Sequence, residues 1–169
     1  MGQRPIAKAV LIGGLIGGAL DLLFALSFAG YNGAAPSRVF QSIASGLLGN
    51  AASSGAVGVE ALGVACHFGI SLLWAALFAL IASRLPTLAL RPILSGLAFG
   101  VVVFLSMRLV VLPLSAYPHP VTFKPLATVL DLLSHMLLFG APIALVVSRA
   151  ILGRGSNNSS KPKPLRGSA

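Results

Sequence analysis

The chain has 169 residues, of which 56% are hydrophobic and only 9% are charged, and its mean hydropathy is +0.94. A water-soluble domain needs a charged surface that this composition cannot supply, so the composition predicts a membrane-embedded chain. The formal net charge of +9 does not indicate a nucleic-acid partner, because the basic residues lie at the ends of apolar runs and in the C-terminal segment.

Four apolar segments are long enough to cross a hydrocarbon core of about 30 Å as helices. They cover roughly residues 8–29, 57–83, 92–112 and 126–151. Helices are expected because isolated strands would leave backbone groups unpaired in lipid. The segments are separated by chain-breaking residues, among them Gly30 and Gly33, Pro86, Pro113, and Pro118 with Pro120. The sequence therefore predicts an all-α integral membrane protein, a four-helix bundle formed by residues 1–152, with the lipid bilayer as its main partner.

Residues 36–48 have a different pattern from the four spans. Pro36 suits a first helical turn, and Val39, Phe40, Ile43 and Leu47 recur at helical spacing. This pattern predicts a short amphipathic helix between the first two spans. It would lie on the outer membrane surface or cap the bundle, or it would be an ordinary packed loop helix.

The C-terminal residues 153–169 are rich in Gly, Ser, Pro and Lys and have no apolar periodicity. We expect this basic tail to be disordered and its charges to attract anionic lipid headgroups.

The distribution of basic residues predicts the orientation. Only Arg38 and Lys124 belong to the connections on one side of the predicted spans. The other side carries Arg4, Lys8, Arg84, Arg91, Arg149, Arg154, Lys161, Lys163 and Arg166. By the positive-inside rule, the N-terminus and the C-terminus are both cytoplasmic. An alternative is that residues 1–29 form a cleaved signal peptide, but Asp21 interrupts the apolar region that such a peptide needs.

Every acidic residue of the chain lies inside a predicted span. Counting 1.5 Å per residue from the outer ends places Glu60, Arg108 and Asp131 roughly 7–9 Å below the outer boundary. The same count places Asp21, His67 and His135 near the bilayer centre, at roughly 13–15 Å. Charged groups at such depths are costly and normally face other helices, so these six residues are predicted to form an intramembrane polar cluster.

The helical faces agree with this interpretation. Asp131 and His135 are four residues apart and share one face of the fourth span. In the first span Gly13, Gly17 and Asp21 form a ridge of i+4 spacing, so Asp21 is expected to face a neighbouring helix. Gly96 and Gly100 are the corresponding helix-packing residues of the third span. The alternative is that the cluster is a purely structural hydrogen-bond network that locks the helices together.

The chain resembles the small bacterial inner-membrane proteins of the YagU-like type, whose biochemical activity is not established. The resemblance covers roughly residues 60 to 150 and lies in His67, Leu85-Pro86, Gly96, Gly100, Met107, Pro113-Leu114 and the run Asp131-Leu-Leu-Ser-His135. The chain departs from the family in its short first connection, and neither Asp21 nor Arg108 matches a family motif. The resemblance implies a multi-pass protein of the bacterial plasma membrane and no catalytic mechanism.

Three hypotheses of function follow from these residues. The first is a proton- or small-cation-handling protein in which Asp21, His67, Asp131 and His135 exchange protons, with any conduction requiring a homo-oligomer. The second is a bundle that binds haem through His67 and His135, or a divalent metal through His67, His135 and Asp131. The third is a membrane assembly protein without a cofactor, docked through the glycine ridges. An enzyme is the least supported class, because the sequence contains no recognisable catalytic motif.

Overall fold

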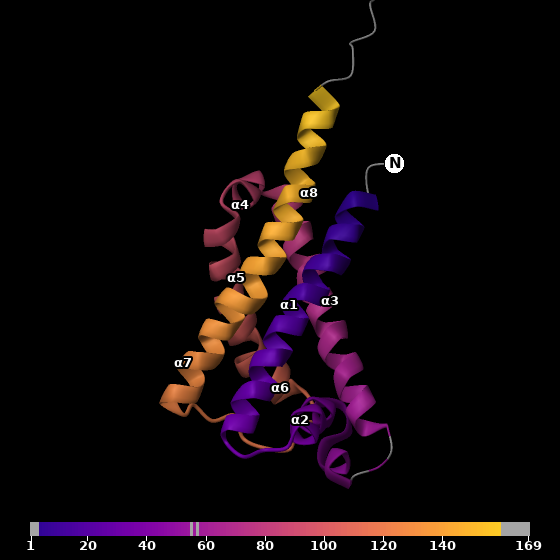
Figure 1. Ribbon diagram of the computed structural model, residues 1–169, viewed down its shortest axis with the longest axis vertical. Coiled ribbons are helices and arrows are strands. Elements are labelled where there is room, and N and C mark those ends of the chain that lie inside the picture. Colours follow the sequence, from indigo (N-terminus) through magenta and orange to yellow (C-terminus); the bar gives the residue numbers. More distant parts are fainter. Residues whose placement is uncertain (1–3, 55, 57, 160–169) are drawn as a thin grey trace, which may run out of the picture.

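The computed structural model describes residues 4–54, 56 and 58–159, and all regular structure in these residues is helical (Figure 1). The elements in chain order are α1 (Arg4–Tyr31), α2 (Pro36–Leu48), η1 (Gly49–Ser54), α3 (Val59–Arg84), α4 (Pro86–Leu90), α5 (Pro92–Ser106), η2 (Met107–Val111), α6 (Leu112–Leu114), α7 (Pro125–Ser134), η3 (His135–Gly140) and α8 (Ala141–Ser159). The element η1 is a 3₁₀ helix, whereas η2 and η3 are π-helical turns inside longer helices.

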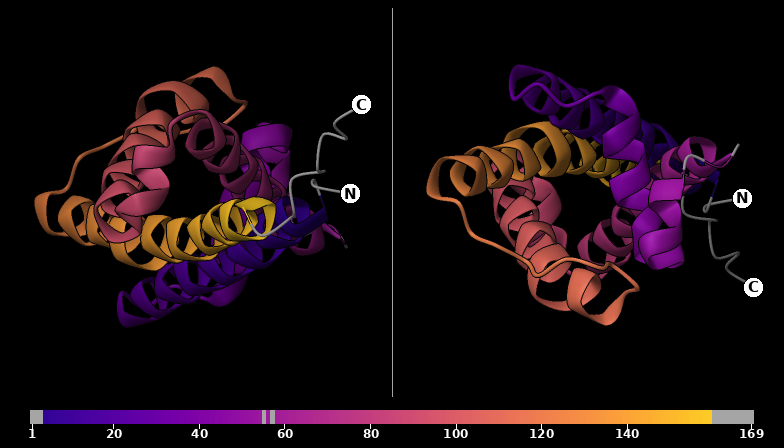
Figure 2. Two further views of the ribbon diagram at one scale, coloured as in Figure 1. Left: turned by 90° about the horizontal axis from the view of Figure 1, so that it is seen from above. Right: turned by 90° about the horizontal axis from the view of Figure 1, so that it is seen from below.

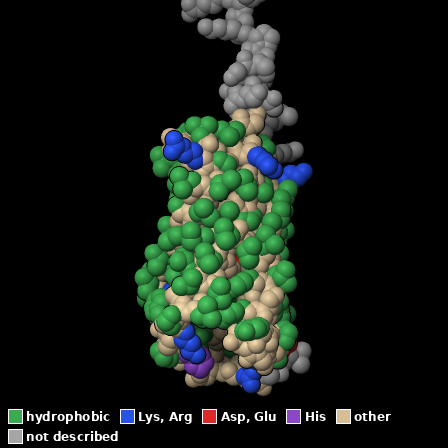
Figure 3. Space-filling view, turned by 60° about the vertical axis from the view of Figure 1, so that its left-hand side comes forward, with side chains coloured by type: hydrophobic (Ala, Val, Ile, Leu, Met, Phe, Trp, Pro, Cys, Tyr) green, Lys and Arg blue, Asp and Glu red, His purple; other side chains and the backbone are tan. Residues whose placement is uncertain are grey.

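Four helices are long and apolar enough to cross a membrane: Pro5–Tyr31, Val59–Arg84, Pro92–Leu114 and Pro125–Gly153. Their outward faces carry many exposed apolar side chains, and Leu23, for example, is 61% exposed and Leu73 is 69% exposed. Hydrophobic side chains cover much of the surface between the two ends, and Lys and Arg side chains gather near the ends (Figure 3). An apolar surface of this extent is suited to lipid and not to water, as expected of a multi-pass membrane protein.

The helix α1 packs against both α3 and α8, and α5 packs against α8 and η3 (Figure 2). An apolar core fills the half of the molecule that contains α4 and both termini. Its buried members include Ala75, Phe78, Val103, Ile143 and Val147. At the opposite end α2 packs against α3, where the backbone of Phe40 lies on Gly63. A backbone bond from the N–H of Ala116 to the Gly46 carbonyl, 2.9 Å long, ties the 115–124 connection to α2.

Glycine allows α1 to approach two helices at once. Gly13 and Gly17 face Ile143 of α8, while Gly14 and Gly18 face Leu72 and Ser71 of α3. A Cβ at Gly18 would lie only 2.7 Å from the Ser71 hydroxyl oxygen. The repeated Gly-Gly pairs of the sequence therefore give α1 two adjacent close-packing faces, of which the i+4 ridge described above is one.

A second glycine contact joins α5 to the fourth long helix. Gly96 lies against Ala141 and Gly140, and Gly100 lies against the backbone of His135 and Met136. Gly140 was not singled out from the sequence, although it meets both Gly96 and Gly100. Because three glycines meet there, the two backbones touch directly, and this contact positions His135.

Two boundaries differ from the sequence-based expectations. Residues 153–159 belong to α8, where we expected the disordered tail to begin. No proline occurs between Pro142 and Pro162, so nothing in the sequence removes a backbone donor from this stretch of helix. Residues 160–169 of the predicted tail lie outside the described residues. Pro113, expected to end the third span, lies within the last turn α6, and the helix ends after Leu114.

The glycine contact between α5 and η3 predicts a large effect of a single methyl group. Replacing Gly100→Ala places a Cβ against the backbone of His135 and Met136, which cannot move aside as a side-chain tip would. We expect the free energy of unfolding in mixed micelles to fall by about 1–3 kcal/mol. The matched control is Gly69→Ala in α3, where a Cβ meets nothing within 4 Å. Equal stability of the two variants would contradict this packing.

Candidate functional site

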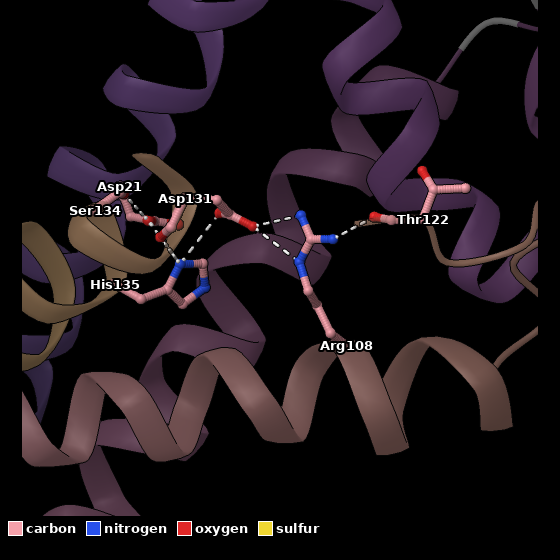
Figure 4. A network of polar contacts seen from close by, with 6 residues as sticks. All are labelled: Asp21, Arg108, Thr122, Asp131, Ser134 and His135. Carbon is pink, nitrogen blue, oxygen red and sulfur yellow. Dashed lines mark hydrogen bonds and ion pairs between the residues drawn. The ribbon is translucent and has the colours of Figure 1, made fainter. Parts of the chain in front are cut away.

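An ion pair between Arg108 and Asp131 links the third and fourth long helices (Figure 4). The Nε and Nη2 atoms of Arg108 both donate to Oδ2 of Asp131, at 3.2 and 2.8 Å. Its Nη1 donates to the backbone carbonyl of Thr122 at 2.8 Å, so the 115–124 connection also holds the guanidinium. The two side chains are 19% and 31% exposed, which makes the pair only partly accessible.

Two aromatic rings complete the surroundings of Arg108. The guanidinium carbon lies 5.2 Å from the ring centre of Phe104 and 5.4 Å from that of Phe123. Each ring face attracts the cation, and together with Asp131 they hold the side chain in one orientation. Arg108 is thereby directed toward the fourth helix.

His135 lies between two carboxylates. Its Nδ1 is 2.8 Å from the backbone carbonyl oxygen of Asp131, 3.3 Å from Oδ1 of Asp131 and 3.8 Å from Oδ1 of Asp21. These three oxygens only accept hydrogen bonds when the acids are ionised, so Nδ1 carries a hydrogen. The hydroxyl of Ser134 donates to Oδ1 of Asp21 at 2.6 Å. We call Asp21, Arg108, Asp131, Ser134 and His135 the polar centre.

The polar centre has an unbalanced charge when His135 is neutral. Two ionised carboxylates and one guanidinium sum to −2 + 1 = −1. Protonation of the imidazole brings the sum to zero. Because Asp21 and His135 are only 15% and 16% exposed, an uncompensated charge among them is costly. The geometry therefore favours one added positive charge at this centre.

Both π-helical turns belong to this part of the structure, and each stands just before a proline. The N–H of Leu112 bonds to the Met107 carbonyl, five residues back, and Pro113 follows. The N–H of Ala141 bonds to the Met136 carbonyl, also five residues back, and Pro142 follows. A proline in a helix lacks a donor and crowds the carbonyl four residues earlier, and a widened turn relieves this crowding. These widened turns contain Arg108 and His135.

His67 joins α3 to α1 and is not bonded to the polar centre. Its Nε2 donates to the carbonyl of Gly18 at 2.8 Å, and the buried Ser71 hydroxyl donates to the carbonyl of Gly14 at 2.6 Å. The two donors, His67 and Ser71, are four residues apart on α3, and the two acceptors, Gly18 and Gly14, are four residues apart on α1. The same kind of bond is therefore made twice along the contact between α1 and α3. Each carbonyl is accessible because glycine exposes the backbone.

Three cavities lie at the α2 end of the molecule. The large cavity, about 540 Å³, is bordered by α1, α2, α3 and α7, and its polar lining consists of Asp21, Arg38, Ser42, His67, Arg108 and Asp131. The small cavity, about 290 Å³, lies between η2 and the 115–124 connection. Arg108 and Asp131 line both of these, so the ion pair stands between them. A polar pocket of about 150 Å³ adjoins α2 on its other side.

The structure brings together four of the six residues predicted for the polar cluster: Asp21, Arg108, Asp131 and His135. His67 lines the large cavity with Asp21 but bonds to backbone. Glu60 is a correction, because it is exposed and lies in the first turn of α3. There the amide groups at the helix start favour a negative charge, and no partner inside the protein is needed.

The metal hypothesis also needs correction. Within the described residues, no three His, Cys, Asp or Glu side chains are placed to hold a metal ion. Asp131 and His135 are adjacent, but His67 is directed to the Gly18 carbonyl and so does not complete the set. Nε2 of His67 and Nδ1 of His135 bond to protein carbonyls, which leaves the second nitrogen of each ring for a ligand, so the haem hypothesis stays a prediction.

Several contributors were missed from the sequence. The Ser134 hydroxyl donates to Asp21. Its position next to His135 in the Asp131–His135 run could have identified it as a member of the polar centre. Phe104, Phe123 and Thr122 surround Arg108, but only the tertiary structure brings the 115–124 connection to it. Arg38 lines the large cavity, whereas the sequence analysis used it only to predict the orientation of the chain in the membrane.

Comparisons with protein-family models, with curated proteins and with solved structures give no match for this chain. The geometry described above therefore carries the functional interpretation.

The ion pair can be measured with a double-mutant cycle. Arg108→Gln leaves the Asp131 carboxylate without its two charged donors, and Asp131→Asn leaves the guanidinium without its acceptor. Each single variant should lose about 1.5–3 kcal/mol of unfolding free energy in micelles. The double variant should lose less than the sum of the two, because both single variants remove the same ion pair and each leaves one charge without its partner, whereas the double variant leaves neither. Strictly additive losses would show that the two side chains do not interact.

Proposed function

We propose that this protein is a small polytopic membrane protein that takes up and releases one proton at the polar centre. The observation that supports this most is the position of the His135 imidazole between the carboxylates of Asp21 and Asp131. Histidine exchanges protons near neutral pH, and two carboxylates beside a single guanidinium favour its charged form. Ser134 holds Asp21 and Arg108 holds Asp131, so proton exchange at the imidazole leaves the geometry in place.

The proton exchanges with the compartment at the α2 end. The large and small cavities border Asp131 from two sides, and the small cavity also borders His135. Toward the α4 end the core consists of apolar side chains such as Phe78, Val103 and Ile143, which cannot relay a proton. The cavity of about 390 Å³ between α1 and α3 at that end has no titratable side chain in its described lining. Within one chain the centre thus acts as a proton-binding site open to one side. Conduction across the membrane requires a further path, which a homo-oligomer would supply. A monovalent cation in the large cavity would balance the same charge without protonating His135.

In the proposed arrangement, four helices form a bundle in a bacterial plasma membrane with both termini in the cytoplasm. The end of the molecule that contains the termini and α4 carries Lys8, Arg84, Arg91 and Arg149, whereas Arg38 and Lys124 belong to the α2 end. The positive-inside rule places the more basic end in the cytoplasm. The polar centre then lies in the outer half of the membrane.

Labelling of single cysteines tests the orientation. In a Cys66→Ser background, a cysteine at the exposed position Thr87 in α4 should react with a membrane-impermeant maleimide only after the cells are opened. A cysteine at the exposed position Ser54 in η1 should react in intact cells with a permeable outer envelope. The reverse pattern would invert the topology and place proton exchange on the cytoplasmic side.

Protonation can be observed directly, because the chain contains only two aspartates and three histidines. In nanodiscs, protein labelled with ¹³C-carboxyl aspartate and ¹⁵N-histidine should show one coupled step between about pH 5 and pH 8. The step should change the His135 imidazole signal and at least one aspartate signal together. In His135→Gln the coupled step should be absent, because the imidazole that takes up the proton is no longer there.

The control for this titration is His119→Gln, which removes an exposed histidine outside the polar centre and should leave the coupled step intact. An imidazole signal of His135 that stays neutral over the whole range would refute proton uptake. The network would then serve only to join the helices, or a cation would supply the missing charge.

A further inference from the structure

The polar pocket beside α2 is suited to an anion. Its polar lining consists of Arg38, Gln41, Ser42, Ser45, Ser53 and His119. The Ser45 hydroxyl already donates to the Ser42 carbonyl. The guanidinium, amide, imidazole and other hydroxyl groups of the lining can donate hydrogen bonds to a ligand, and no carboxylate lines the pocket. This set provides a cation and several donors for a phosphate group, with no negative charge to repel it.

Arg38 is the cation that lines the polar pocket. In the part of the chain that the structure describes, it has no carboxylate partner, whereas Arg108 is bound to Asp131 and held by two rings. Its side chain is exposed on α2. An arginine guanidinium can donate two parallel hydrogen bonds to a phosphate, so its charge and its geometry both suit this ligand.

The polar pocket shares two lining residues with the large cavity, whose wall is mainly apolar. Arg38 and Ser42, one turn apart on α2, line both the polar pocket and the large cavity. The apolar wall of the large cavity is formed by Phe24, Ala25 and Phe28 of α1 and by Val39 and Ile43 of α2. The volume of about 540 Å³ lies within the range of about 300–1,000 Å³ that small-molecule sites occupy.

The large cavity lies where two long helices separate. The helix α1 packs against α8 and η3, but α7 diverges from it toward the α2 end (Figure 2). Side chains of both α1 and α7 line the cavity, including Phe28 and Ala127. Because the outer surfaces of these helices are apolar, this side of the cavity adjoins the acyl region of the bilayer.

We propose that the α2 end binds an anionic phospholipid, with its phosphate on Arg38 in the polar pocket and an acyl chain in the large cavity. The proposal does not depend on proton uptake at the polar centre. A headgroup with an added ammonium group is disfavoured, because no carboxylate lines the polar pocket to receive it. Free phosphate would use only the polar pocket and would leave the apolar wall without a role.

Native mass spectrometry of the detergent-solubilised full chain tests this site. Phosphatidylglycerol and phosphatidylcholine with the same acyl chains are added separately, and the bound fractions are compared. Both phosphates can reach Arg38, but the choline ammonium cancels the net negative charge of phosphatidylcholine and meets no carboxylate in the polar pocket. We therefore expect the wild type to bind phosphatidylglycerol about tenfold more tightly. Arg38→Gln should remove this preference and Arg38→Lys should retain part of it. The matched control is Lys124→Gln, which removes the other cation of the α2 end and should leave the preference unchanged.

The acyl chain is tested by filling the large cavity. Ile43→Trp should weaken binding of phosphatidylglycerol without changing the charge at the site. Equal binding of the two lipids by the wild type, or an unchanged preference in Arg38→Gln, would overturn the proposal. Displacement of the lipid by millimolar inorganic phosphate, together with unchanged binding in Ile43→Trp, would also overturn it, since the site would then recognise phosphate alone.

Discussion

A carboxylate inside an apolar helix assembly needs an opposite charge or strong hydrogen-bond donors, and this requirement organises the site. Asp131 is satisfied by two nitrogens of Arg108, and Asp21 by the Ser134 hydroxyl. His135 lies beside both acids and is the one group there whose charge can change near neutral pH. Three long helices, the first (α1), the third (through η2) and the fourth (through α7 and η3), are thus joined at the polar centre.

Proline connects the backbone to this centre. The π-helical turns η2 and η3 each end two residues before a proline, and in each the residue before the proline bonds five residues back. A widened turn adds a residue to the helix and rotates all that follows relative to what precedes it. Arg108 lies in η2, which precedes Pro113, and His135 lies in η3, which precedes Pro142. Each proline therefore affects the direction of one of these two side chains through the widened turn. Gly96, Gly100 and Gly140 then allow η3 to rest against the backbone of α5.

The two ends of the molecule differ in character. The end with α4 contains the apolar core and a largely apolar cavity of about 390 Å³ between α1 and α3, whereas the α2 end contains the polar centre and the three cavities that adjoin it or α2. Neighbouring cavities share residues: Arg108 and Asp131 belong to two of them, and so do Arg38 and Ser42. The large cavity is lined both by residues of the polar centre and by the exposed Arg38, so in our proposals proton exchange and lipid binding influence each other through electrostatics.

The sequence by itself determined the four apolar helices, the helix over residues 36–48, the packing face of Gly13 and Gly17, and the proximity of Asp131 and His135. All of these depend on composition or on spacing along one helix, which local periodicity encodes. Only the tertiary structure decided that Arg108 pairs with Asp131, that Ser134 binds Asp21, that His67 bonds to a backbone carbonyl, and that Glu60 is exposed. Those outcomes depend on the rotation and divergence of separate helices. The rotation of a helix changes at a π-helical turn, and the distance between two helices changes at a glycine contact. Neither can be read from the sequence of one segment alone.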